Sequence, residues 1–132
     1  MDSMTVLIVE DDKNLRTGLE RILTKEGYKV YGVTDGMVGL DFLRNHNYDL
    51  VLLDIYLPRL SGMQLLRYIK QYKLAKRVII LTAASEMKIA QEAIRIGADD
   101  ILIKPFDLKS LLNCISRVLT PNNLQKVTTA CN

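Results

Sequence analysis

The chain has 132 residues, of which 48% are hydrophobic and 25% are charged, and its formal net charge is +3 at pH 7. This length suits one domain with its own core, the composition excludes a disordered chain, and the small net charge gives no indication of direct nucleic-acid binding. The apolar runs are far shorter than the roughly 20 residues of a membrane span, and the N-terminus lacks the apolar stretch of a signal peptide. Two cysteines, Cys114 and Cys131, cannot form a disulfide framework. We therefore expect a cytoplasmic, single-domain protein that does not bind membranes.

In its first half, the chain alternates apolar runs with segments of helical periodicity. In order, the pattern predicts a strand at Thr5–Val9, a helix with apolar positions from Leu15 to Leu23, a strand at Tyr28–Val33, a weaker helix at Met37–Leu43 and a strand at Leu50–Leu53. Gly27 ends the first helix. Because Tyr28–Val33 is the most polar of the predicted strands, we expect it at an edge of the sheet.

The second half continues the same alternation. After a loop with Pro58 and Gly62, the pattern predicts a helix through Leu65, Leu66 and Ile69, a strand at Val78–Leu81, a helix on Ala90, Ala93 and Ile94, a strand at Ile101–Ile103 and a helix from Leu108 to Leu119. Residues 1–120 form the predicted domain. Residues 121–132 have little periodicity, and we expect a C-terminal tail or the beginning of a linker there.

Five strand–helix units with apolar strands predict an α/β fold, a doubly wound, five-stranded parallel sheet with helices on both faces. We expect the flavodoxin-like (βα)5 arrangement with strand order 2-1-3-4-5. In an open parallel sheet, sites form outside the carboxyl ends of the strands. The residues at the ends of the predicted strands are therefore the candidates for function.

Polar side chains follow four of these strands. Glu10–Asp12 follow the first strand, Asp54 the third, Thr82 the fourth and Lys104 the fifth. Clustered carboxylates repel one another unless a cation neutralises them, and oxygen ligands without histidine or cysteine favour Mg²⁺. With the Lys104 charge and the Thr82 hydroxyl, they predict a pocket for a phosphoryl group beside a nucleophilic carboxylate. Each residue alone is also typical of a cap, a turn or a solvated side chain, so only their convergence indicates a site.

Four segments resemble the receiver domain of two-component response regulators. These segments are Val6–Asp12, Asp49–Gly62, Ile80–Ala83 and Gly97–Phe106, and the likeness extends from Thr5 to Leu119. The resemblance implies a domain that accepts a phosphoryl group from a phosphohistidine of a sensor histidine kinase or a phosphotransfer protein. Such a domain catalyses its own phosphorylation and dephosphorylation. We therefore expect no enzyme with a separate substrate.

By this resemblance, Asp54 is the phosphorylated residue. Glu10 and Asp11 hold Mg²⁺ together with Asp54 and the backbone carbonyl of Tyr56, whereas Asp12 only begins the next helix. The bulky Tyr56 also borders the path of a water molecule that attacks the phosphoryl group, so we expect it to slow hydrolysis.

The same resemblance gives Thr82 a hydrogen bond to one phosphoryl oxygen and Lys104 an ion pair with another, and it implies a cis Lys104–Pro105 peptide bond. Receivers usually carry Tyr or Phe at the position of Ile101, an aromatic residue that turns inward when the hydroxyl residue moves. Ile101 departs from this pattern, which puts the aromatic switch in question but not the phosphorylation chemistry.

Receivers generally meet their partners through the face formed by the fourth helix, the fifth strand and the fifth helix. We expect the output surface there, and a homodimer through this face is one candidate assembly. No recognisable output segment follows Leu119 in the sequence. The sequence thus fits either a stand-alone receiver or the first domain of a longer regulator, and the output partner stays open.

Three alternative functions fit parts of the pattern. A phosphatase of the haloacid dehalogenase type needs a second aspartate at the position of Tyr56, and a cap domain that 132 residues cannot hold. A flavodoxin-like cofactor-binding module needs a phosphate loop after the first strand, where Glu10–Asp12 would repel an anion. A degenerate receiver, used only as an interaction module, stays open, although the complete set of site residues argues against it.

Overall fold

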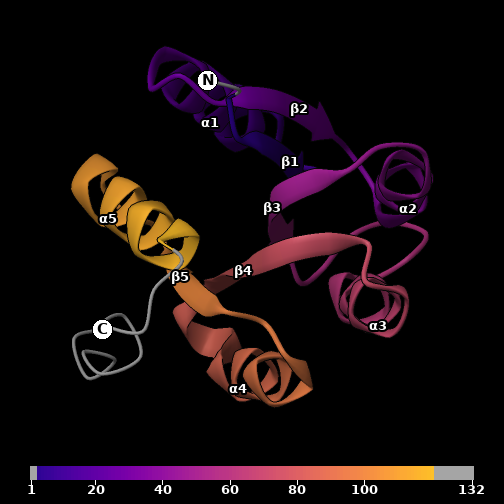
Figure 1. Ribbon diagram of the computed structural model, residues 1–132. Helices are drawn as coiled ribbons and strands as arrows, with labels where there is room; N and C mark the ends of the chain where they lie inside the picture. The colour runs from indigo at the N-terminus through magenta and orange to yellow at the C-terminus, as the bar shows by residue number, and fades with distance from the viewer. Residues whose placement is uncertain (1–2, 121–132) are drawn as a thin grey trace.

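The computed structural model describes residues 3–120, which form a five-stranded parallel sheet with helices on both faces (Figure 1). The strands are β1 (Thr5–Val9), β2 (Lys29–Val33), β3 (Tyr48–Asp54), β4 (Ala75–Ala83) and β5 (Asp100–Lys104), in the order β2-β1-β3-β4-β5. The helices are α1 (Lys13–Lys25), α2 (Gly36–Asn45), α3 (Gly62–Tyr72), α4 (Met87–Ile96) and α5 (Leu108–Leu119), and a 3₁₀ turn at Ala84–Glu86 precedes α4. The predicted fold class, the strand order and the edge position of β2 are confirmed.

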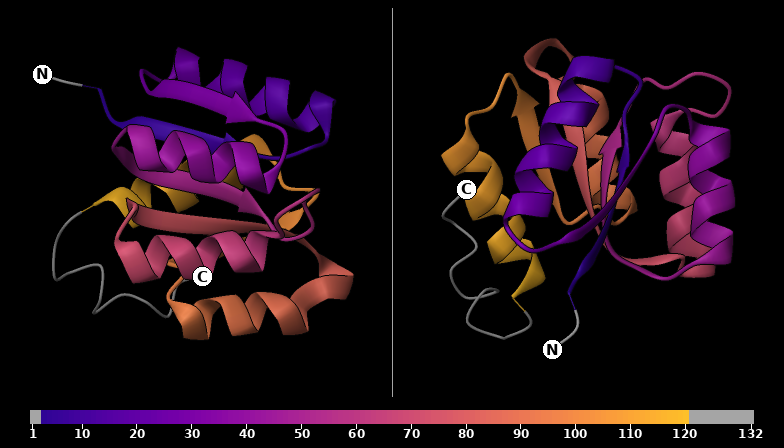
Figure 2. Two further views of the ribbon diagram at one scale, coloured as in Figure 1. Left: turned by 90° about the vertical axis from the view of Figure 1, so that its right-hand side faces the viewer. Right: turned by 90° about the horizontal axis from the view of Figure 1, so that it is seen from above.

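A hydrophobic layer fills the space on each face of the sheet. Helices α2, α3 and α4 cover one face and α1 and α5 cover the other, as Figure 2 shows from two directions. In β3, Val51 and Leu53 belong to the first layer, while Leu50 and Leu52 belong to the second. Successive residues of a strand point to opposite faces. Because both faces are covered, the strand is apolar throughout its middle rather than alternating.

Strands β3 and β4 are longer than the apolar runs that predicted them. Tyr48, which precedes the run in β3, pairs with Ala75 in parallel register, and Lys76–Arg77 at the start of β4 are exposed. The ladder uses backbone groups, so pairing continues beyond the buried apolar side chains. At its other end β4 extends to Ala83, which places Thr82 within the strand rather than after it.

Side chains cap the beginnings of four helices. The capping residues are Asp12 for α1, Asp35 for α2, Ser61 for α3 and Asp107 for α5. Each side-chain oxygen accepts the backbone N–H three residues later, which has no partner within the helix. Asp12 accepts the Leu15 N–H at 3.1 Å. The expectation that Asp12 begins the helix after β1 is therefore confirmed.

The described part of the chain ends at Thr120, directly after α5. The predicted tail at residues 121–132 lies outside it. None of the helices within residues 3–120 combines the length and the hydropathy that crossing a membrane requires.

Candidate functional site

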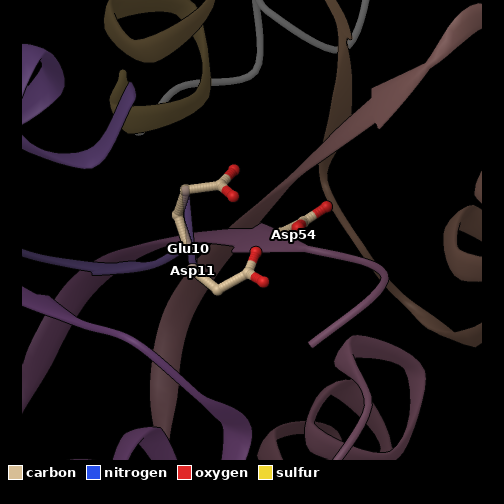
Figure 3. A group of neighbouring side chains, drawn as sticks. All are labelled: Glu10, Asp11 and Asp54. Carbon is tan, nitrogen blue, oxygen red and sulfur yellow. The ribbon is translucent and has the colours of Figure 1, made fainter. Parts of the chain in front are cut away.

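Three carboxylates meet at the edge of the sheet where the strands have their carboxyl ends. Figure 3 shows Glu10 and Asp11, directly after β1, beside Asp54, the last residue of β3. One carboxylate oxygen from each residue lies within 4.8 Å of the other two. The strand register explains this approach, because Val9 pairs with Leu53 and the next residues of the two strands, Glu10 and Asp54, come side by side.

Two of these carboxylates are buried and the third is exposed. Glu10 is 1% exposed and Asp54 is 7% exposed, whereas Asp11 lies at the surface. The Glu10 N–H donates to the Val33 carbonyl at 3.1 Å, which continues the β1–β2 ladder, and Glu10 Oε2 accepts the Asp12 N–H at 3.1 Å. The inner side of the cluster is thus held by backbone hydrogen bonds, and Asp11 forms its solvent side.

Lys104, the last residue of β5, brings a positive charge into the cluster. Its Nζ lies 2.8 Å from Glu10 Oε1 and 3.4 Å from Asp54 Oδ1. Burial on its own would lower the pKa of Lys104, but the contacts with Glu10 and Asp54 outweigh burial and raise the pKa. The peptide bond between Lys104 and Pro105 is cis, as expected.

The cluster keeps an excess of negative charge, which fits a divalent cation. Burial raises the pKa of Asp54 to about 6, with a further rise from the Glu10 carboxylate that Lys104 partly offsets. Glu10 Oε1 is buried, and Lys104 Nζ, 2.8 Å away, is its counter-charge. One lysine offsets only one of the three carboxylate charges, and like charges held this close repel one another unless a cation neutralises them. Carboxylate oxygens without nitrogen or sulfur ligands suit Mg²⁺, so the residues present fit this ion.

The Thr82 hydroxyl contacts the loop before α4 and not the carboxylate cluster. Thr82 is fully buried, and its Oγ1 lies 3.3 Å from Glu86 Oε1 and 3.3 Å from the Ala83 carbonyl oxygen. Thr82 lies near the end of β4 as expected, whereas its partner Glu86 was not predicted. The available signal was the spacing from Ala83, because a glutamate near the start of a helix commonly accepts the backbone N–H three residues earlier.

Tyr56 lies on the β3–α3 loop with 53% of its surface exposed. The loop is folded tightly, because the Gly62 N–H at the start of α3 donates to the Ile55 carbonyl at 2.7 Å. A Cβ atom on Gly62 would lie 2.0 Å from the Asp54 carbonyl oxygen, so only glycine fits. This close approach fixes the path of the loop directly after Asp54.

Ile101, at the position expected to hold an aromatic residue, lies in β5 opposite Ile80. Its side chain is partly buried and packs against the hydrophobic layer under α2, α3 and α4. The Ile101 N–H donates to Asp100 Oδ1 at 2.7 Å. The structure thus places Ile101 beside the core rather than in the carboxylate cluster.

Comparisons with known proteins agree with this geometry. A family model described as the response regulator receiver domain matches residues 6–116. The chain is 42% identical over 114 residues to the response regulator ArlR of Staphylococcus aureus, and this match covers 86% of the chain and 52% of ArlR. The chain therefore spans about half the length of the curated relatives it matches.

Solved structures share the fold. A CheY-like response regulator receiver domain protein from Methanospirillum hungatei is 28% identical with a TM-score of 0.85, over 95% of this chain and 98% of that one. The receiver domain of the sensor histidine kinase PA1611 from Pseudomonas aeruginosa, which has a magnesium ion coordinated in its active site cleft, is 29% identical with a TM-score of 0.79, over 89% and 98% of the two chains. By its sequence match and its fold, the chain belongs to the response regulator receiver domain family.

Proposed function

We propose that Asp54 accepts a phosphoryl group from a phosphohistidine of a sensor histidine kinase or a phosphotransfer protein, and that this modification switches an output surface. The observation that carries the proposal is the cluster of Glu10, Asp11 and Asp54, with Lys104 Nζ 3.4 Å from Asp54 Oδ1. Phosphoryl transfer needs a nucleophile, a site for a divalent cation and a fixed positive charge, and all three roles have a candidate here.

Mg²⁺ is the cofactor of this proposal, held by Glu10, Asp11, Asp54 and the carbonyl of Tyr56. The bound ion would neutralise charge on the oxygens of the transferring group. Three carboxylates against the single positive charge of Lys104 support a cation at this place. The magnesium ion in the active site cleft of the PA1611 receiver domain supports the same assignment.

In the transfer, a carboxylate oxygen of Asp54 attacks the phosphorus atom. The new P–O bond forms while the P–N bond breaks, and the electron pair of that bond leaves with the imidazole. Lys104 pairs with one phosphoryl oxygen and the Thr82 hydroxyl donates a hydrogen bond to another. These two contacts stabilise the negative charge of the phosphoryl group. Water attacks the same phosphorus atom in hydrolysis, and Tyr56 borders its path. No separate substrate is turned over.

We assign the output surface to α4, β5 and α5. Ile94 on α4 is 41% exposed and Ile103 on β5 is 43% exposed, so each of these two elements offers an apolar side chain to a protein partner. A homodimer through this face is one candidate assembly. We further assign residues 1–120 to the receiver domain, 121–132 to a tail or the start of a linker, and the whole to the cytoplasm, where its phosphohistidine donor would lie.

Incubation with acetyl phosphate and Mg²⁺, followed by intact mass measurement, tests the proposal. The wild-type protein should gain one phosphoryl mass, and Asp54→Asn or a chelator should abolish the gain. Asp41→Asn, which changes an exposed carboxylate on α2, is the matched control and should gain the mass normally. A degenerate receiver would gain no mass at all. Phosphorylation of another aspartate in the Asp54→Asn protein would show that the assignment of Asp54 is wrong.

A further inference from the structure

Glu86 holds two groups of the preceding strand with one oxygen. Its Oε1 lies 3.3 Å from Thr82 Oγ1 and accepts the Ala83 N–H at 3.1 Å. Thr82 is fully buried and Glu86 is partly buried. The Ala83 carbonyl also lies 3.3 Å from Thr82 Oγ1, but an ionised carboxylate is the stronger acceptor. The hydroxyl hydrogen of Thr82 is therefore directed toward Glu86.

This contact competes with the role that phosphorylation gives to Thr82. A hydroxyl group carries a single hydrogen. It cannot be donated fully to Glu86 and to a phosphoryl oxygen on Asp54 at the same time. The contact with Glu86 thus stabilises only the unphosphorylated arrangement, and a group that interacts with one of two states shifts the equilibrium between them.

We propose that Glu86 is a positioning residue that retains the Thr82 hydroxyl in the unphosphorylated state and links its release to the start of α4. The inference rests on the proposed phosphorylation of Asp54. Glu86 is the last residue of the 3₁₀ turn, and α4 begins at the next residue. When Thr82 turns to the phosphoryl group, Glu86 loses one of the two donors that fix it. The change at the site thereby reaches the first turn of α4, on the assigned output surface.

An ordinary helix cap accounts for only one of the two hydrogen bonds. Glutamate side chains commonly accept a backbone N–H three residues earlier at the start of a helix, as Glu86 does from Ala83. The hydrogen bond from Thr82 adds nothing to that cap. A cap alone predicts that removing Glu86 lowers stability and leaves the affinity for a phosphoryl group unchanged, which separates the two explanations.

Binding of beryllofluoride with Mg²⁺, followed by NMR, tests the proposal on the whole chain. Glu86→Ala should bind this phosphoryl mimic about 3- to 10-fold more tightly than wild type, because the competing hydrogen bond is gone. Glu86→Gln keeps an acceptor oxygen without the charge, so its affinity for beryllofluoride should lie between those of wild type and Glu86→Ala. In a Thr82→Val background, which lacks the hydroxyl, Glu86→Ala should change the affinity little. Glu92→Gln, which removes the same charge from an exposed pair with Arg95 on α4, is the matched control and should have no effect.

Two results would overturn the proposal. If Glu86→Ala raises the affinity for beryllofluoride equally in the wild-type and the Thr82→Val proteins, Glu86 acts through its charge alone. If Glu86→Ala lowers the melting temperature but leaves the affinity for beryllofluoride unchanged, Glu86 acts only as a helix cap. If the wild-type protein binds no beryllofluoride, the proposed function itself fails. A measurement on the free protein then tests the role of Glu86. In the free protein, NMR couplings should show a single χ1 rotamer for Thr82 in wild type and averaged rotamers in Glu86→Ala, and identical rotamer populations in the two proteins would exclude the retaining contact.

Discussion

Lys104 Nζ lies 2.8 Å from Glu10 Oε1, although the strands that lead to these residues, β5 and β1, are separated in the sheet by β3 and β4. The lysine side chain passes over the ends of two strands and lies 3.4 Å from Asp54 Oδ1, at the end of one of them. This contact can form only when the four strands are paired. The charge balance of the site therefore depends on the pairing of β1, β3, β4 and β5.

Replacing Lys104 with Met should destabilise the metal-free protein, because Glu10 and Asp54 would remain as buried like charges without a counter-charge. We expect a loss of about 2 kcal/mol in the free energy of unfolding, measured by urea denaturation with a chelator present, and Mg²⁺ should restore part of it. Lys76→Met is the control, because Lys76 pairs with Asp49 but is 76% exposed. It should cost less than about 0.5 kcal/mol. Equal losses would contradict the importance of the buried contact.

Asp11→Asn should weaken Mg²⁺ binding about tenfold or more, while Asp12→Asn should have little effect. The Asp11 carboxylate belongs to the cluster and faces solvent, where it can bind the ion directly. The Asp12 side chain instead caps α1, a role that asparagine also fills. Calorimetric titration with Mg²⁺ measures both variants. If they lose affinity equally, the division of roles between these neighbours is wrong.

The pH dependence of stability can be checked at Asp35, away from the carboxylate cluster. The hydrogen bond from the Val38 N–H, helped by the Arg59 guanidinium 3.2 Å away, lowers the pKa of Asp35. A carboxyl with a lowered pKa stabilises the fold above its unfolded pKa of about 4, and this contribution is lost as the pH falls through the folded value. Asp35→Ala should therefore cost about 1 kcal/mol at pH 7 and less at pH 3.

Asp35→Asn separates the charge from the cap. Asparagine also caps helices well. The loss in the free energy of unfolding for Asp35→Asn should therefore be smaller than that for Asp35→Ala at pH 7, and it should vanish at low pH. Urea denaturation at both pH values provides the comparison. If Asp35→Ala lowers the free energy of unfolding equally at pH 7 and pH 3, the ionised form of Asp35 contributes nothing to stability.

The sequence predicted the strands by their buried centres and not by their ends. Leu50–Leu53 is apolar because helices cover both sides of β3. Such a continuous apolar run can be recognised in the sequence alone. The pairing of Tyr48 with Ala75 depends only on backbone groups, so no side-chain pattern marks it. The same limit explains why β4 was predicted to end before Thr82.

The carboxylate cluster was predictable because parallel strands bring their carboxyl ends to one edge. Asp54 and Glu10 follow buried runs and fall side by side once the strand order is known. The partner of Thr82 was not predictable in this way. Glu86 accepts the hydroxyl through the geometry of a 3₁₀ turn, and neither periodicity nor strand order determines which way that side chain points.

Ile101 should change little when a phosphoryl mimic binds. It is apolar, packs against the hydrophobic layer under α4 and has no hydroxyl that would favour an outward position in solvent. The two states should therefore differ at Thr82, Lys104 and the segment Ala83–Ile94, where contacts to the phosphoryl group are made or relayed. NMR amide shifts on addition of beryllofluoride and Mg²⁺ should be concentrated there. Ile101→Val should alter the affinity by less than about twofold, whereas Thr82→Val should weaken it clearly. A full outward-to-inward rotamer change of Ile101 between the free and bound structures would instead establish the usual switch at this position.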